Sequence, residues 1–185
     1  AVFVAKPLVQ LCDFGYRTPM QTERKQVALL LGSENDLSLV QPAIKMLAEL
    51  EIPYSVRILS AHRLGEEACN FASNARSEGF GVLIAAAGKA AHLAGTLASR
   101  TLLPVIGLPL SASLGGLDAL LSTVQMPNGY PVATVAIDGA VNAALLAAQI
   151  LALSDPALLS RLEAARQAGQ EAVREADRRI AKSFM

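Results

Sequence analysis

Both histidines of this chain stand shortly after an apolar run, and one of them is followed by an arginine. Ser60-Ala61-His62-Arg63 comes after the run from Tyr54 to Leu59, and His92 follows the run from Gly81 to Ala87. An arginine can hold a phosphate group through two parallel N–H donors, and an imidazole exchanges protons near neutral pH. These residue types predict a site that binds an anion and moves a proton, with an ordinary surface loop as the alternative.

Two more loops offer places for a ligand. Gly32-Ser33-Glu34-Asn35-Asp36 follows the run from Val27 to Leu31 and opens a helical pattern, where backbone N–H groups favour an anion such as phosphate. Asp36 is placed either to cap that helix or to bind sugar hydroxyl groups. The loop from Ala86 to Gly95 has small residues that let a ligand approach the backbone, while Lys89 and His92 add charge and hydrogen-bond donors.

The elements that must position these loops alternate along the chain. Five apolar runs are separated by helical patterns: Val27–Leu31, Tyr54–Leu59, Gly81–Ala87, Leu102–Leu108 and Pro131–Ile137. Runs that are apolar at every position are typical of strands covered on both faces. The alternation predicts a three-layer α/β fold, a doubly wound sheet of five parallel strands. Ligands bind at the carboxyl ends of such strands, and we expect Gly115-Gly116 and Gln125–Gly129 to complete the loops at that edge.

Other segments carry no chemistry of their own. Pro42 interrupts the first helical pattern, so we expect that helix to begin near Ser38. Residues 1–26 show no convincing element and are expected to form an arm or leader, ahead of an α/β domain over residues 27–154. From Asp155-Pro156 onward the sequence predicts a long helix reaching Lys182, with Asp155 as its cap. Its apolar stripe is Leu158, Leu162, Ala165, Ala172, Ala176 and Ile180. That helix packs either on its own domain or across a neighbouring subunit.

The composition excludes several classes of protein. The chain has 185 residues, of which 52% are hydrophobic and 17% charged, with 16 basic and 16 acidic side chains. Such a chain is not disordered, and its zero net charge argues against a nucleic-acid binder. No apolar window is long enough to span a membrane. The two cysteines do not suggest a disulfide framework, and no signal sequence is apparent, so we expect a cytoplasmic protein.

Known short motifs do not account for these loops. The sequence contains no dinucleotide-binding GxGxxG, no phosphate-binding GxxxxGK[ST] and no nucleophile elbow GxSxG. The histidines are far apart in the sequence and have no acidic cluster beside them, so no metal site is expected.

Longer segments, however, carry a resemblance. They are GSEND, SAHR, AAGKAAHLAG, LPVIGLPL, GLDALLSTVQMPNGYPVATVAI and NAALLAAQILAL. Together they resemble the N5-carboxyaminoimidazole ribonucleotide mutase family of purine biosynthesis, of the bacterial type, over roughly Val27 to Arg166. The resemblance implies a flavodoxin-like fold and a homo-octamer with sites between subunits. It also implies transfer of a carboxylate from N5 to C4 of a ribonucleotide's imidazole without any cofactor or metal.

The resemblance assigns roles to residues of this chain. Ser33, Asn35, Ser60 and Arg63 would bind the substrate phosphate, and Asp36 the ribose hydroxyl groups. His62 would be the catalytic residue, which protonates N5 as carbon dioxide leaves and then removes the proton from C4. The loop from Ala86 to Gly95 would hold the carbon dioxide and keep water away. Its substrate-binding members are Ala87, Gly88, Lys89, His92 and Leu93.

The sequence departs from the family's usual motifs in the loops. Asn35 replaces a Ser, Lys89 stands where Gly is usual, Ala94 replaces a Pro, and Leu64-Gly65 replaces Thr-Pro. The loop at Asp138–Val141 is altered or shortened. Two alternatives to the mutase therefore stay open. One is a relative that carboxylates or decarboxylates another heteroaromatic ribonucleotide, and the other is a nucleotide-binding protein without catalytic activity.

Overall fold

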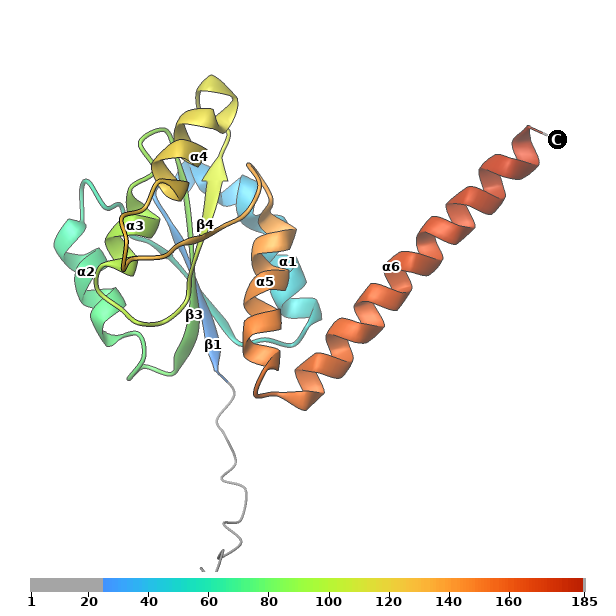
Figure 1. Ribbon diagram of the computed structural model, residues 1–185, viewed down its shortest axis with the longest axis horizontal. Helices are drawn as coiled ribbons and strands as arrows, with labels where there is room; N and C mark the ends of the chain where they lie inside the picture. The colour runs from blue at the N-terminus through green and yellow to red at the C-terminus, as the bar shows by residue number, and fades with distance from the viewer. Residues whose placement is uncertain (1–24, 185) are drawn as a thin grey trace, which may run out of the picture.

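The apolar runs of the sequence form one parallel sheet. The computed structural model describes residues 25–184 (Figure 1). Its strands are β1 Gln26–Leu31, β2 Tyr54–Ile58, β3 Phe80–Gly88, β4 Val105–Leu110 and β5 Ala133–Thr134. They pair in the order β2-β1-β3-β4-β5, and every pair is parallel. This order is that of flavodoxin-like sheets, so the predicted doubly wound fold is confirmed.

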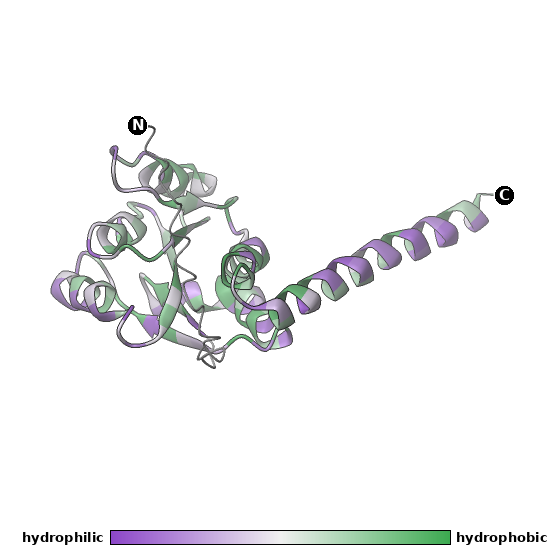
Figure 2. Ribbon diagram, turned by 60° about the horizontal axis from the view of Figure 1, so that its bottom comes forward, coloured by the Kyte–Doolittle hydropathy of each residue, from purple (hydrophilic) through white to green (hydrophobic). Residues whose placement is uncertain are grey.

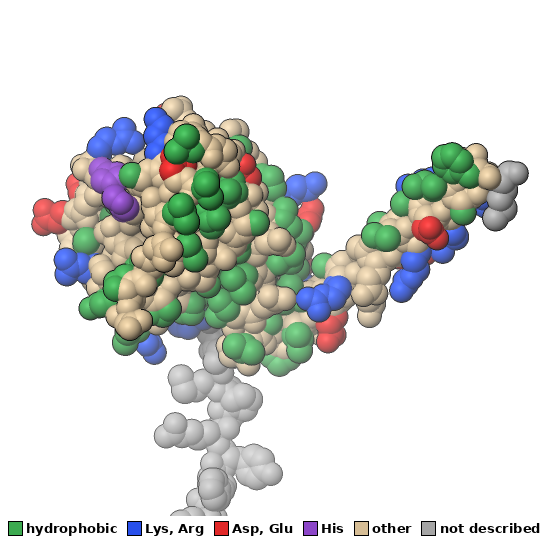
Figure 3. Space-filling model, turned by 45° about the horizontal axis from the view of Figure 1, so that its top comes forward, with side chains coloured by type: hydrophobic (Ala, Val, Ile, Leu, Met, Phe, Trp, Pro, Cys, Tyr) green, Lys and Arg blue, Asp and Glu red, His purple; other side chains and the backbone are tan. Residues whose placement is uncertain are grey.

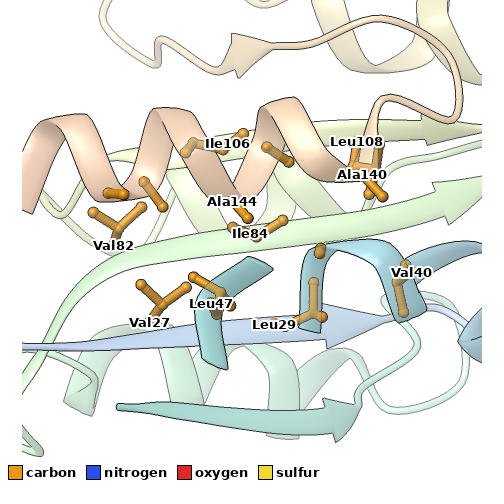
Figure 4. Packing of buried hydrophobic residues seen from close by; sticks show 14 of the residues in the cluster. Val27, Leu29, Val40, Leu47, Val82, Ile84, Ile106, Leu108, Ala140 and Ala144 are labelled. Atoms are coloured by element: carbon orange, nitrogen blue, oxygen red, sulfur yellow. The ribbon is translucent and has the colours of Figure 1, made fainter. Parts of the chain in front are cut away.

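Helices cover both faces of this sheet. They are α1 Leu37–Glu49, α2 Gly65–Asn74, α3 Leu93–Ala98, α4 Leu117–Val124 and α5 Ala140–Ala152, with short 3₁₀ turns η1 Glu34–Asp36 and η2 Leu114–Gly116. Helices α1 and α5 lie on one face, and α2, α3 and α4 on the other (Figure 1). The core has two matching halves because successive strand residues point to opposite faces. Leu29 and Ile84 pack with α1 and α5 (Figure 4). Leu30 and Leu83 lie in the other half.

Small residues let α5 lie close to the sheet. Ala140, Ala144 and Ala147 are buried in the first half of the core, where α5 packs against β3, β4 and α1. Burying apolar surface contributes roughly 25 cal/mol per Å². An alanine offers little of that area, but its small size brings the helix backbone near the strands, where larger side chains such as Ile106 fill the space (Figure 4).

Some predicted boundaries were wrong. The fourth strand begins at Val105 rather than Leu102, because Leu102 is 96% exposed and lies in a loop. The fifth strand has two residues instead of seven. Helix α1 begins at Leu37, close to the expected start, but Pro42 is inside it. Pro42 therefore lies beyond the first turn of α1, and because proline has no N–H, the helix lacks one backbone hydrogen bond at that residue.

The last helix is long and leaves the body of the molecule. Helix α6 spans Pro156–Ser183, and the carboxylate of Asp155 accepts a hydrogen bond from Leu158 N at 3.0 Å, which confirms the predicted cap. Arg161 ties the beginning of α6 to α1, since its Nε donates to the Leu50 carbonyl at 2.7 Å. Beyond these turns the helix projects away from the domain (Figure 1).

No helix within residues 25–184 has the length and apolar character needed to cross a membrane. The arm expected over residues 1–26 lies outside the described residues, except for Lys25 and Gln26, the latter in β1.

Candidate active site

The strand order places the candidate site. The direction of winding reverses between β1 and β3, so a crevice opens beyond their carboxyl ends, where ligands bind in open parallel sheets. The loops after β1, β2 and β3 all reach this crevice. A cleft of about 500 Å³ is found there, which is within the usual size range of small-molecule sites.

The loop after β1 turns into α1 through η1. Ser33 caps η1, because its hydroxyl oxygen accepts a hydrogen bond from Asn35 N at 3.3 Å. Asp36 occupies the cap position of α1, yet its carboxylate makes no capping hydrogen bond. Of the two roles that the sequence left open for Asp36, capping is thus wrong. The carboxylate remains available to a ligand in the cleft.

The environment of Asp36 makes ionisation of its carboxyl group more costly. Partial burial raises the pKa of this carboxyl above its usual value, although a hydrogen bond from the Ser33 backbone and the charge of Arg63 act in the opposite direction. A hydroxyl-rich ligand that donates hydrogen bonds to the carboxylate would offset part of the cost of burying its charge.

Arg63 joins the loops after β1 and β2. Its Nε donates to Ser60 Oγ at 3.3 Å, and its Nη2 donates to the Gly32 carbonyl at 3.1 Å. Ser60 itself is buried. A guanidinium has five N–H donors, so after these two contacts Arg63 keeps donors for an anion beside the start of η1.

The loop after β3 is shaped by a close backbone approach. A Cβ on Gly88 would lie 2.5 Å from the Cβ of Ala112, which follows β4, so only glycine fits there without a shift. The next residue, Lys89, has a φ of 57°, in the left-handed region. The chain then turns through Ala90 to His92, which stands at the start of α3.

These loops bring the two histidines together. His62 Nε2 and His92 Nδ1 are 2.9 Å apart, and their rings meet nearly edge to face, with centroids 5.0 Å apart. At this distance one nitrogen carries a proton and the other accepts it. The pair lies on the surface near basic side chains (Figure 3), and both rings are exposed in the single chain.

Every predicted site residue lines this cleft. The eleven are Ser33, Asn35, Asp36, Ser60, His62, Arg63, Ala87, Gly88, Lys89, His92 and Leu93. Gly32, Ala61, Ala90 and Ala112 also line it. The first three belong to the predicted loops but were assigned no role, whereas Ala112 was missed. Pro109-Leu110 continue the apolar run beyond Leu108, so they indicate that the fourth strand ends at Leu110. The loop after Leu110, which contains Ala112, could therefore have been assigned to the carboxyl edge of the sheet.

Other expected residues lie elsewhere. Gly115-Gly116 follow the carboxyl end of β4, at the predicted edge, but they do not line the cleft. Gln125–Gly129 lie between α4 and the amino end of β5, so their predicted place at the carboxyl edge was wrong. Gly129 instead lines a second hollow beside Val105, at the opposite end of β4. Within residues 25–184, no three His, Cys, Asp or Glu side chains gather as a metal ion would require.

Comparison with known proteins gives a consistent result. Residues 26–172 match the AIR carboxylase family. The N5-carboxyaminoimidazole ribonucleotide mutase of Pyrococcus horikoshii is 51% identical over 144 residues, which cover 77% of this chain and 81% of that protein. The mutase of Haemophilus influenzae is 51% identical over 145 residues, or 77% and 88% of the two chains. The crystal structure of a Treponema denticola PurE2 variant superposes with a TM-score of 0.76 at 27% identity, covering 85% of this chain and 98% of that one. This protein therefore belongs to the AIR carboxylase family.

Proposed function

We propose that this protein is an N5-carboxyaminoimidazole ribonucleotide mutase, an isomerase of purine biosynthesis that needs no cofactor. The observation that carries the proposal is the His62–His92 pair, set among anion-binding loops at the carboxyl edge of the sheet. Relatives that are about half identical over most of the chain bear this name. A proton-moving pair next to a phosphate site is what this carboxylate transfer requires.

The loops after β1 and β2 hold the nucleotide. Ser33, Asn35, Ser60 and Arg63 bind the phosphate, because hydroxyl, amide and guanidinium donors converge beside the N–H groups of η1. Asp36 accepts hydrogen bonds from the ribose hydroxyl groups with the carboxylate that α1 leaves uncapped. This places the imidazole toward the loop after β3.

His62 supplies and recovers one proton. When the N5–carboxyl bond breaks, N5 takes a proton from the His62 imidazolium and carbon dioxide is released. C4 then attacks the carbon dioxide, a carbon–carbon bond forms, and neutral His62 removes the proton that C4 carried. One proton leaves His62 and one returns, so the cycle closes without a cofactor.

His92 determines which nitrogen of His62 does this work. If His62 Nε2 donates to His92 Nδ1, the other nitrogen of His62, Nδ1, is the one that gives and takes the proton. The same atom can then serve both steps without a ring flip. His92 is in this way a positioning residue as well as a part of the cleft wall.

The loop after β3 retains the carbon dioxide. Ala87, Gly88 and Leu93 present small or apolar side groups to the cleft, and such groups offer water no side-chain hydrogen bond in the place where carbon dioxide waits. Keeping the released molecule beside C4 makes the second step effectively intramolecular.

Assembly completes the enzyme in this proposal. His62 and His92 are exposed in one chain, whereas the reaction needs a site closed to water. The surface over η2 and α4 exposes apolar residues at helical spacing, namely Leu114, Leu117, Leu121 and Val124 (Figure 3). We expect a cytoplasmic homo-octamer in which residues 27–154 form the catalytic domain and residues 155–185 pack on a neighbouring subunit.

The test is conversion of N5-carboxyaminoimidazole ribonucleotide to the 4-carboxy product, measured against its spontaneous decarboxylation. His62→Asn should lower kcat by at least about a hundredfold while nucleotide binding is kept, because the acid–base group is gone. His92→Asn should lower kcat less and leave KM nearly unchanged. Unaltered turnover in His62→Asn would contradict the mechanism, and no conversion by the folded wild type would contradict the function.

A further inference from the structure

Lys89 has an unusual backbone for its residue type. Its φ of 57° lies in the left-handed region, where side chains other than glycine are disfavoured by contact between Cβ and the carbonyl oxygen. Glycine would adopt this conformation without that cost. The chain nevertheless carries a long, flexible cation there, directly after β3, and strain of this kind clusters at functional sites, where a use of the side chain offsets its cost.

The position of Lys89 suggests that use. Lys89 and Arg63 both line the cleft and follow the two strands, β3 and β2, that flank β1. Neighbouring strands are about 4.8 Å apart, so these two cations rise from opposite sides of the loop after β1. Arg63 is fixed by its hydrogen bonds to Ser60 and Gly32. Lys89 lies in the same loop as His92, at the end of the cleft where the proton is moved.

The charges of the cleft leave Lys89 without a protein partner. No Asp or Glu within residues 25–184 forms an ion pair with it, and the one carboxylate among the lining residues, Asp36, interacts with the charge of Arg63. The proposed substrate has two anionic groups, a phosphate and a carboxylate, the latter carried by the amino nitrogen N5 beside the imidazole ring. Arg63 matches the first, and an ammonium beside the histidine pair matches the second.

We infer that Lys89 is a specificity-determining residue whose ammonium binds the migrating carboxylate, so that the cleft prefers carboxylated aminoimidazole ribonucleotides over the uncarboxylated nucleotide. This inference rests on the proposed function. Because the carboxylate is present on both N5 and C4 isomers, Lys89 assists binding of substrate and product alike. It discriminates against the nucleotide that has lost its carbon dioxide.

The test compares equilibrium binding of two stable ligands, 4-carboxy-5-aminoimidazole ribonucleotide and 5-aminoimidazole ribonucleotide, by titration calorimetry. The measured quantity is the ratio of their Kd values. Lys89→Met removes the charge and keeps the stem, and should lower the preference for the carboxylated ligand about tenfold, a typical effect of losing one charge-assisted hydrogen bond. Lys89→Arg should keep the preference. Lys45→Met, the same change on an exposed lysine of α1, is the matched control and should leave the ratio unchanged.

Lys89→Gly separates binding from backbone strain. It should raise the Tm because glycine accepts the left-handed conformation, yet lower the preference as much as Lys89→Met does. In the wild type the preference should weaken as salt concentration rises, and in Lys89→Met it should depend less on salt. An unchanged ratio in both Lys89→Met and Lys89→Gly would overturn the inference.

The outcome is distinct from that of the proposed function. A wild type that converts the substrate, together with variants of unchanged Kd ratio, would overturn only the role of Lys89. A wild type that binds both nucleotides without converting them would overturn the mutase activity, while the ratio still decides the role of Lys89. A wild type that binds neither nucleotide would overturn both.

Discussion

The carboxyl group of Asp36 illustrates how a single residue can favour function at the expense of stability. It stands at the cap position of α1 without capping it, and partial burial raises its pKa. An aspartate in the unfolded chain has a pKa of about 3.9. Below that pH the group is protonated in both the folded and the unfolded state, so folding buries no charge. As the pH rises through the folded pKa, the folded protein must bury a charge that the unfolded chain exposes, so stability is lost.

Asp36→Asn should therefore raise the Tm at pH 7, and this gain should shrink as the pH falls below about 4. The same variant should bind the nucleotide more weakly, because the amide is a poorer acceptor for the ribose hydroxyl groups. Thermal unfolding of the wild type and of Asp36→Asn across this pH range gives the difference between their Tm values. The other titrating groups are the same in both proteins, so their contributions largely cancel. A Tm difference that does not depend on pH would contradict the role given to burial.

At the scale of elements, the end of β3 and the loop after β4 fix one another through Gly88 and Ala112. Gly88→Ala places a Cβ 2.5 Å from that of Ala112, and overpacking of this kind costs about 1–3 kcal/mol. We expect urea unfolding to show this loss and kcat to fall, since the loop carrying Lys89 and His92 must shift.

Two further variants check that the loss arises from this contact. Ala112→Gly in the Gly88→Ala background should restore most of the stability. Gly65→Ala is the matched control, because no atom lies within 4 Å of the Cβ it adds, and it should not destabilise the protein. A double variant as unstable as Gly88→Ala would show that the strain lies elsewhere.

The same elements explain what could be predicted from the sequence. Strands covered on both faces are apolar at every position, so the interiors of β1, β3 and β4 were evident. Their ends were not, because hydropathy alone does not distinguish the exposed Leu102 from a buried leucine. Chain order also placed both histidines at one edge. Their hydrogen bond was beyond prediction, since β2 and β3 are separated by β1 and the contact depends on how each side chain reaches across it.

At the scale of the whole molecule, α6 has an anchored beginning and an unpartnered end. Leu158 is buried, and Leu162 packs against the core. Farther along, Val173 and Ile180 are exposed on a helix that projects from the domain, and Phe184, directly after the helix, is exposed as well. Figure 2 shows hydrophobic and hydrophilic residues on different sides of this helix. On the charged side, Glu171 accepts hydrogen bonds from Arg174 and Arg178, which lower its pKa.

An isolated helix gains little from such a stripe, because most helical stability comes from packing an apolar face against a partner. If α6 packs on a neighbouring subunit, Val173→Asp with Ile180→Asp puts two charges into that contact. We expect a smaller assembly in light scattering after size-exclusion chromatography, and a Tm that falls on dilution. Arg179→Asp, next to Ile180 on the same helix, also introduces an aspartate and should leave the assembly intact. Equal assembly of all three proteins would mean that the far half of α6 makes no subunit contact, and the cover over the exposed histidine pair would then have to come from the apolar surface of η2 and α4.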